Sequence, residues 1–356
     1  IQPGDVVGGD KVEGDKITIS DADHSAIAVG DGATAILTII ERALSAVEVA
    51  DQAEAQATRR LGEALKIYVQ SLAELAELGK NQAARPNPYK ALLSYELQDA
   101  PLFFGRDQNC TELLGALDQG RLTVLYAESG AGKTSLLKAG LMSRLVARGD
   151  VPVYIRPRDT SVPFRLKSTL LPALNETPIL EDDSLRDFLW RATKLLPDRK
   201  LVVLLDQFED VFDLQSVAER TAFGKELADC LDDQTLRVRW VVSLRQEYFV
   251  RFGEFKQVKE PFGNVVSLPR MNKEQAREVI VGPSRLKRVN WEQTVTDQVL
   301  AELAAGDSGI LPVQLQLVCA ELFERSASHA ITYSTYQEAG GVKGIVNSYL
   351  NTVLDR

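Results

Sequence analysis

One short stretch, residues 122–137, restricts the possible folds of this chain more than any other. It reads LTVLYAESGAGKTSLL, which is an apolar run, a turn of small residues and a helical pattern that starts at Gly132. A strand, a tight loop and a helix N-terminus in this order direct several backbone N–H groups at one point, and the positive end of the helix dipole adds to them. The stretch therefore predicts a phosphate-binding loop between a strand and a helix.

The residues of this loop have different expected tasks. Lys133 is expected to contact the β- and γ-phosphates, and the Thr134 hydroxyl to bind Mg²⁺. Ala127 stands where the phosphate-loop pattern has Gly, but this position opens the turn and tolerates Ala. A Gly-rich turn without a ligand is the alternative interpretation. The remaining expected phosphate contacts are Ser129, Gly130, Ala131, Gly132 and Ser135.

A second stretch, LVVLLDQFED at 201–210, ends an apolar run with an acid. Such a strand must be buried on both faces, as in a parallel sheet covered by helices. Its carboxyl end then lies beside the phosphate loop, where open α/β sheets bind ligands. Asp206 is therefore the expected second ligand of Mg²⁺, directly or through water. The alternative is that Asp206 only caps the following turn.

Composition sets the class of protein. The 356 residues are 45% hydrophobic and 26% charged, which is typical of a soluble chain of about two to three domains. No apolar run approaches the roughly 20 residues that span a bilayer, so we expect a cytoplasmic location and no membrane partner. The net charge of −9 argues against nucleic acid as a direct partner. The scattered thiols of Cys110, Cys230 and Cys319 suit a reducing compartment.

Residues 1–35 are rich in Gly-Asp pairs, which recur every five residues at Gly4, Gly9 and Gly14. The β-branched residues between them predict very short strands joined by turns. A segment of this size cannot bury a core alone. It predicts either a β-element completed by neighbouring copies of the chain or a flexible linker. Because the chain starts with Ile1, we also expect sequence upstream of it.

Residues 36–84 predict one long helix or a helical hairpin. Between 36 and 78 there is no proline, and apolar residues recur at alternating steps of four and three. An unbroken helix of this length would extend about 65 Å, more than one compact domain can cover. We therefore expect residues 1–80 to join copies of the chain. A hairpin that packs on its own chain is the alternative.

The rest of the chain predicts an α/β domain and then helices. The prolines of Arg85-Pro-Asn-Pro88 mark a domain boundary. Over residues 85–270, apolar runs alternate with helical stretches, which indicates a three-layer domain around a parallel sheet. A small helical lid domain is expected over 271–335, and a further domain is expected to start at 336–356. The expected strands are 122–126, 151–155, 201–205, 238–244 and 264–268.

Taken in order, these motifs resemble the bacterial branch of the STAND ATPases, signal-transduction relatives of the NACHT and NB-ARC immune-receptor NTPases. The resemblance runs from about Tyr89 to the C-terminus. Residues 88–106 are similar to the family's first segment, whose loop, here Phe104, Gly105 and Arg106, lies against adenine. Gly309-Ile-Leu-Pro312 resembles the motif whose proline, here Pro312, closes over the base. Residues 340–344 are similar to the start of a winged-helix domain.

The resemblance implies a P-loop NTPase that binds ATP or ADP with Mg²⁺ and couples nucleotide state to oligomerisation. Such a switch would activate an effector in bacterial defence or regulation, and the NTPase domain would take part in homo-oligomer contacts. The effector would lie upstream and the sensor downstream of this chain. Two alternatives stay open: a scaffold with a permanently bound nucleotide, and a remodelling or nucleic-acid-linked ATPase.

The sequence also departs from the family's pattern where hydrolysis is concerned. Gln207 stands where fast relatives have the glutamate that polarises water, and Glu209 is the nearest substitute. A displaced base should cost orders of magnitude in rate, so we expect at most a slow Mg²⁺-dependent ATPase. Arg245 resembles the family's sensor arginine and is expected to contact the γ-phosphate. Its alternative role is to pair with a carboxylate at the edge of the sheet.

Overall fold

The computed structural model describes residues 29–45, 52–80, 87–158, 160–304, 309–326 and 330–354. The short strands expected within residues 1–28 lie outside this part of the chain. The expected β segment does not extend to residue 35, because the chain is helical from Val29 onward. Ala33 and Ile36 pack their side chains into the core of the molecule, which favours a helix over an isolated strand at this point.

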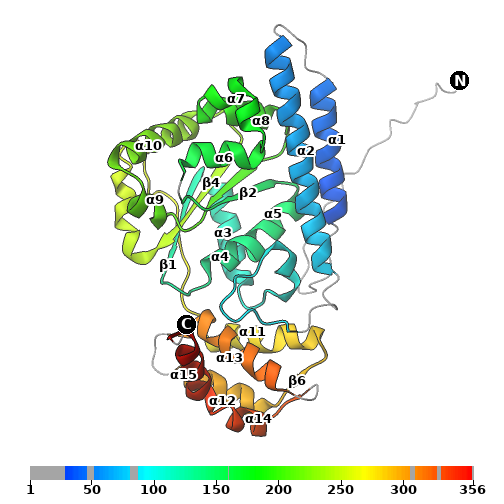
Figure 1. The fold of residues 1–356 in the computed structure, drawn as a ribbon, viewed down its shortest axis with the longest axis vertical. Helices are drawn as coiled ribbons and strands as arrows, with labels where there is room; N and C mark the ends of the chain where they lie inside the picture. Colours follow the sequence, from blue (N-terminus) through cyan, green and yellow to red (C-terminus); the bar gives the residue numbers. More distant parts are fainter. Residues whose placement is uncertain are drawn as a thin grey trace, which may run out of the picture.

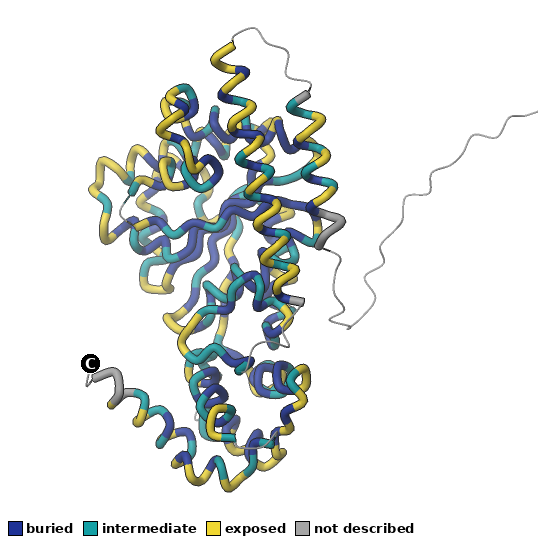
Figure 2. The backbone as a smooth tube through the Cα atoms, turned by 45° about the vertical axis from the view of Figure 1, so that its right-hand side comes forward, coloured by how far each residue is buried: buried dark blue, intermediate teal, exposed yellow. Residues whose placement is uncertain are grey.

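Five parallel strands form the central sheet in the order β2-β3-β4-β1-β5, as the three-layer prediction requires. Every residue of β3 is buried, and alternate residues face opposite sides: Val203 packs on one helical layer, Val202 and Leu204 on the other. Burial on both faces explains why these strands are continuous apolar runs in the sequence. Figure 2 shows them as the buried centre of the molecule. The strands are β1 (Leu122–Ala127), β2 (Val151–Ile155), β3 (Leu201–Leu205), β4 (Val238–Arg245) and β5 (Val265–Ser267).

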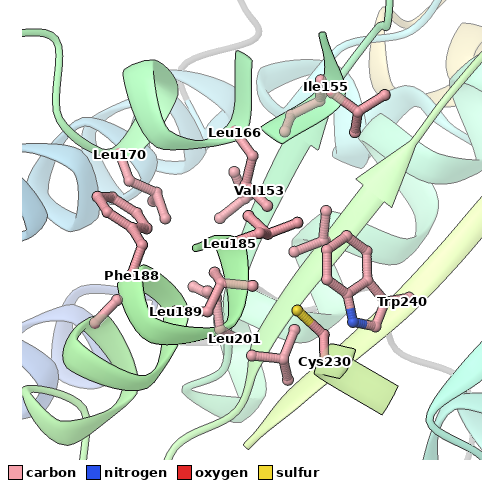
Figure 3. Close-up of a cluster of buried hydrophobic side chains, with 14 of the residues drawn as sticks. Val153, Ile155, Leu166, Leu170, Leu185, Phe188, Leu189, Leu201, Cys230 and Trp240 are labelled. Atoms are coloured by element: carbon pink, nitrogen blue, oxygen red, sulfur yellow. The ribbon is translucent and has the colours of Figure 1, made fainter. Parts of the chain in front are cut away.

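Helices cover both faces of this sheet (Figure 1). On one face, Phe188 and Leu189 meet Val153, Leu201 and Trp240 of the strands in a dense apolar cluster (Figure 3). This layer contains α6 (Val162–Leu170), α7 (Pro178–Asp182), α8 (Leu185–Lys194), α9 (Glu209–Leu214) and α10 (Val217–Asp232). The other layer contains the 3-10 helix η2 (Leu97–Leu102), α3 (Asp107–Gln119), α4 (Lys133–Ser135), the π-helical turn η3 (Leu136–Leu141) and α5 (Met142–Arg148).

The N-terminal helices α1 (Val29–Ser45) and α2 (Gln52–Lys80) form a hairpin beside the α/β domain (Figure 1). The Tyr68 hydroxyl donates to the carbonyl of Pro152 in edge strand β2 at 2.9 Å, so α2 covers that edge. Ile40 and Leu61 are completely buried in the same core as the sheet. The chain therefore adopts the hairpin and not the unbroken helix, and much of the described apolar stripe is covered within the chain, although Leu78 at its end is exposed.

The helical lid domain begins after β5 and runs from Met271 to Leu354, lower in Figure 1. Its core includes Ile280 and Leu315 but also Tyr336 and Ile345, so it continues past the expected boundary at 335. The start of a winged-helix domain at 336 stays a prediction. No helix in the described residues is long and apolar enough to cross a membrane. The lid elements are α11 (Lys273–Leu286), β6 (Asn290–Trp291), α12 (Gln293–Leu303), α13 (Pro312–Arg325), β7 (Ala330–Ile331), α14 (Tyr333–Glu338) and α15 (Gly341–Leu354).

Candidate functional site

A cavity of about 330 Å³ lies where β1, β3 and β4 end, and the lid helix α13 forms part of its wall. We call it the phosphate cavity, because the loop that follows β1 lines it. Most of the residues predicted from the sequence come together here. They are Ser129, Gly130, Gly132, Lys133, Thr134, Glu209, Arg245 and Pro312.

The phosphate loop is built on glycines that no other residue replaces easily. Gly130 and Gly132 have φ angles of 78° and 92°, in the left-handed region that only glycine adopts without strain. A Cβ atom on Gly130 would lie 2.9 Å from Cγ1 of Val313, on the lid helix α13. The loop therefore requires glycine both for its backbone conformation and for its close contact with the lid.

Lys133 lies inside this loop. Its ammonium donates to the backbone carbonyls of Ala127 and Glu128 at 3.1 and 3.2 Å, and it lines the phosphate cavity. Burial lowers the pKa of Lys133, while the carboxylates of Glu209 and Asp206 act in the opposite direction. A buried cation whose hydrogen bonds to the described residues go to two neutral carbonyls suits a site that receives a strongly negative ligand.

Thr134 and Asp206 bring two hard oxygen donors to one point. The Thr134 hydroxyl donates to Oδ2 of the fully buried Asp206 at 2.6 Å. The Tyr154 hydroxyl donates to the same oxygen at 2.9 Å, and Ser243 donates to the other at 2.8 Å. Mg²⁺ prefers a few such protein ligands, with water and phosphate oxygens in its remaining positions. This donor set therefore fits a Mg²⁺ ion bound together with a phosphate.

The sequence did not reveal Tyr154 and Ser243 as supports of Asp206. Burial and Asp206 itself raise the pKa of Tyr154, so its hydroxyl remains a donor to the carboxylate. The available signal was a polar side chain inside each apolar run, at 154 and 243. A polar group in a strand buried on both faces needs a partner, and here Asp206 is that partner.

The two predicted catalytic residues lie in direct contact. Glu209, 5% exposed, accepts hydrogen bonds from the backbone amide and the Nε of Arg245 at 3.2 and 3.0 Å. Gln207 lines the same cavity with a φ of 53°, an uncommon conformation for a residue other than glycine. In this conformation Arg245 pairs with a carboxylate, which was its alternative role, so γ-phosphate contact and general base catalysis stay predictions.

A second, smaller cavity of about 40 Å³ adjoins the first, and we call it the base slot. Its walls are largely apolar, and it shares Tyr95, Gly132, Pro312 and Gln316 with the phosphate cavity. The remaining lining residues are Leu102, Phe103, Phe104, Arg106, Ala131, Ser135, Met271 and Val279. Of the residues expected to contact adenine, Phe104, Arg106 and Pro312 therefore line this slot beside the phosphate loop, whereas Gly105 does not line it.

The residues around Phe104 form close contacts with the lid domain and the phosphate loop. Gly105 has a φ of 75°, and a Cβ atom there would lie 2.4 Å from the carbonyl oxygen of Gln275. The buried guanidinium of Arg106 donates to the carbonyl of Ala131 at 3.0 Å and to Asn109 at 3.2 Å. Burial lowers the pKa of Arg106 to about 10. Arg106 thus supports the phosphate loop through its hydrogen bond to Ala131, and it also lines the base slot.

The lid contributes residues that sequence reasoning missed. Val313 and Gln316 line the phosphate cavity beside Pro312, and so do residues 91–95. The signal for Gln316 was its spacing, because residues four apart on a helix share a face. The ion pair between Glu128 in the phosphate loop and Arg270 before the lid, at 2.8 Å, had no local signal in the sequence.

The first of three similar solved structures supports the same fold. The Walker-type ATPase of Pyrococcus abyssi is similar with a TM-score of 0.51 and 17% identity, over 76% of this chain and 80% of that one. The ORC2 protein of Aeropyrum pernix, in its ADPNP–ADP complexes, gives 0.47 and 14% over 66% of each chain. The Aeropyrum pernix ORC1 protein in complex with DNA gives 0.45 and 19%, over 70% and 66%. No curated protein matches the sequence.

A family model covers most of the chain. The model described as Novel STAND NTPase 1 matches residues 88–356, which include the whole α/β domain and the lid domain. The match thus contains the phosphate loop, Asp206, Arg245 and Pro312, the residues that surround the two cavities. This chain belongs to the Novel STAND NTPase 1 family of P-loop NTPases.

Proposed function

We propose that this protein is an ATP/ADP-binding signalling switch in which the bound nucleotide sets the position of the lid domain. The observation that carries the proposal is that one cavity is lined by both the phosphate loop and α13. A ligand shifts a conformational equilibrium only if it contacts the two states differently. A nucleotide in this cavity would touch both domains at once. Its contacts would therefore change when the lid moves, which meets that condition.

Further contacts between the loop and the lid support this coupling. Both Nε and Nη2 of Arg270 donate to Glu128 of the phosphate loop, at 3.0 and 2.8 Å. The next residue, Met271, exchanges backbone hydrogen bonds with Ile310 in the lid. A charged ligand bound at the phosphate loop would therefore also affect Arg270 and Met271, where the lid domain begins.

The proposal assigns a task to each residue of the site. Lys133 and the loop amides hold the phosphates, while Thr134 and Asp206 hold Mg²⁺, which neutralises phosphate charge when bound. Arg245 contacts the γ-phosphate, and Glu209 accepts a proton from water. Because Arg245 must first exchange Glu209 for the γ-phosphate, hydrolysis is slow and the protein holds its nucleotide for long periods.

The proposal also includes assembly and partners outside this chain. Residues 1–80 and the NTPase domain join copies of the chain, and this gathers upstream effectors when a downstream sensor is triggered, in bacterial defence or regulation. On α2, Ile67 and Leu78 are exposed and are available for such contacts. Nucleic acid is not a partner in this proposal, since the net charge is −9.

The direct test is to measure molecular size and backbone hydrogen exchange with ADP, with ATP and without nucleotide. We expect ADP to protect residues 87–95 and the start of α13, and ATP to alter that protection and the oligomeric state. Identical size and exchange with ADP and with ATP, both different from the nucleotide-free protein, would contradict the switch and leave only a nucleotide-binding protein. Absence of nucleotide binding would contradict the site itself.

A further inference from the structure

Gln316 is a buried polar residue at the meeting point of the two cavities. It lies one helical turn after Pro312 on α13, is only 8% exposed, and lines both the phosphate cavity and the base slot. A glutamine amide carries an acceptor oxygen and a nitrogen with two donor hydrogens. Its orientation therefore decides which of them faces a ligand.

The hydrogen bonds of Gln316 determine this orientation. Its Oε1 accepts from the backbone amide of Lys90 at 3.0 Å and from the Tyr95 hydroxyl at 2.9 Å. A backbone N–H can only donate, so the oxygen and not the nitrogen must face Lys90. Among the described residues none accepts a hydrogen bond from Nε2. The donor side of the amide is thus available to a ligand.

The base slot is suited to a flat, apolar ring. Leu102, Phe103, Phe104, Met271 and Val279 give it apolar walls, and it joins the cavity that the phosphate loop lines. Purine bases have apolar faces and polar edges, and proteins recognise them by stacking and by hydrogen bonds to the edge. A base placed here would meet the amide of Gln316 at its edge.

The slot must also widen to admit a base. Its volume of about 40 Å³ is roughly that of a single water molecule. Tyr95 and Gln316 stand on opposite sides of the joint between the α/β domain and the lid, and their hydrogen bond links the two. Entry of a base therefore moves the apolar walls of the slot apart, while Lys90 and Gln316 stay together because the neighbouring Tyr89 is buried in the core of the lid domain.

We propose that Gln316 selects adenine over guanine by donating a hydrogen bond from Nε2 to N1 of the base. This inference rests on the proposed nucleotide site and specifies its substrate. In adenine N1 is an acceptor, whereas in guanine N1 carries a hydrogen and is a donor. A guanine in the same position would place its N1–H donor opposite the Nε2–H donor of Gln316. A buried unpaired donor is strongly unfavourable.

The test uses Gln316→Glu, which keeps the acceptor oxygen, replaces the donor nitrogen that faces the ligand, and adds one negative charge. Its carboxylate still accepts from Lys90 and Tyr95 but offers the base an acceptor in place of a donor. We expect the affinity for ADP to fall about tenfold or more, while GDP binds as well as before or better. Gln314→Glu is the matched control, because Gln314 is exposed on the same helix and the charge change is the same.

A second measurement needs no variant. We expect the unmodified protein to bind 1-deaza-ADP, in which carbon replaces N1, about tenfold more weakly than ADP. The same substitution in the ligand should make little difference to Gln316→Glu. Calorimetry measures all three ligands, and circular dichroism verifies that the variants are folded.

Several outcomes would overturn the inference. Equal losses for ADP and GDP in Gln316→Glu would mean that Gln316 supports the fold or contacts a shared part of the nucleotide. Equal affinity of the unmodified protein for ADP and 1-deaza-ADP, or no preference for ADP over GDP, would exclude the contact to N1. Failure of the proposed function has a different result: the unmodified protein would bind neither ADP nor GDP.

Discussion

The carboxylate of Glu209 accepts two hydrogen bonds from Arg245, from the backbone amide at 3.2 Å and from the guanidinium at 3.0 Å. The pair connects the start of α9 to the end of β4 beside the phosphate cavity. A general base must offer its lone pair to water, and a γ-phosphate would compete with Glu209 for the arginine. ATP binding and activation of Glu209 are therefore coupled through one ion pair.

Replacing Glu209 by glutamine tests this coupling. We expect Glu209→Gln to bind ATP normally and to hydrolyse it about 10²–10⁴ times more slowly, because the base is lost while the phosphate loop is intact. Phosphate release and calorimetry measure the two properties separately. The exposed Glu247 is the control, since Glu247→Gln removes a nearby charge outside the cavity. Hydrolysis by Glu209→Gln at the original rate would assign the base to another group.

Lys133 should be essential for binding and dispensable for folding. Because burial lowers its pKa in the folded state, the charged lysine reduces stability at neutral pH, and this cost begins to fall as pH rises past the lowered pKa and is gone above the ordinary lysine pKa. We therefore expect Lys133→Ala to keep or slightly raise its melting temperature and to lose ADP and ATP binding. Lys225→Ala, on the exposed side of α10, should change neither. Unaltered ADP affinity in Lys133→Ala would refute the phosphate loop.

Gly130 tests the contact between the phosphate loop and the lid. In Gly130→Ala the new methyl group meets Val313 at 2.9 Å, and the residue keeps a φ of 78°, which costs about 1–2 kcal/mol for an L-residue. We expect ADP affinity to fall about tenfold or more. Adding Val313→Ala should recover part of this loss, since it removes the collision but not the backbone strain. If Val313→Ala recovers nothing, the loop and α13 do not meet in solution.

The sequence predicted the sheet well for a physical reason. The expected strands agree with β1 to β5 to within a residue or two, because strands buried on both faces are continuous apolar runs. The phosphate loop and Asp206 were also predictable, since each depends on residues that are adjacent in the chain. Their contact, the 2.6 Å hydrogen bond of Thr134 to Asp206, follows from the order of the strands.

Other features depend on contacts that no local pattern specifies. The stripe at 36–78 fits a long helix and a hairpin equally well, and what decides is contact with distant helices such as α5, α6 and α8. Gln316 reaches the site only because α13 folds back onto residues 87–95. The positive φ of Gln207 also has no signal in its residue type, and the residues on either side of it are tied by backbone hydrogen bonds to Ile155 and Ser243.

The hairpin provides the last prediction, because its two faces have different tasks. Ile40 and Leu61 are completely buried against the α/β domain, whereas Ile67 and Leu78 on α2 are 67% and 62% exposed. Assembly through residues 1–80 can use the exposed pair without unfolding anything. We expect Ile67→Glu with Leu78→Glu to melt like the parent and to stay monomeric under conditions in which the parent assembles.

The buried face predicts the opposite result. Leu61→Glu would place a charge in the core, and an unpaired buried charge is too costly to retain, so we expect the hairpin to detach and the melting temperature to fall by several degrees or more. Deleting residues 1–80 should destabilise the NTPase domain in the same way, since it uncovers the edge of β2 and the groups around Pro152. Light scattering and thermal unfolding separate the two faces. If the Ile67→Glu, Leu78→Glu protein assembles at the same concentration as the parent, the contacts are assigned to the NTPase domain and not to α2.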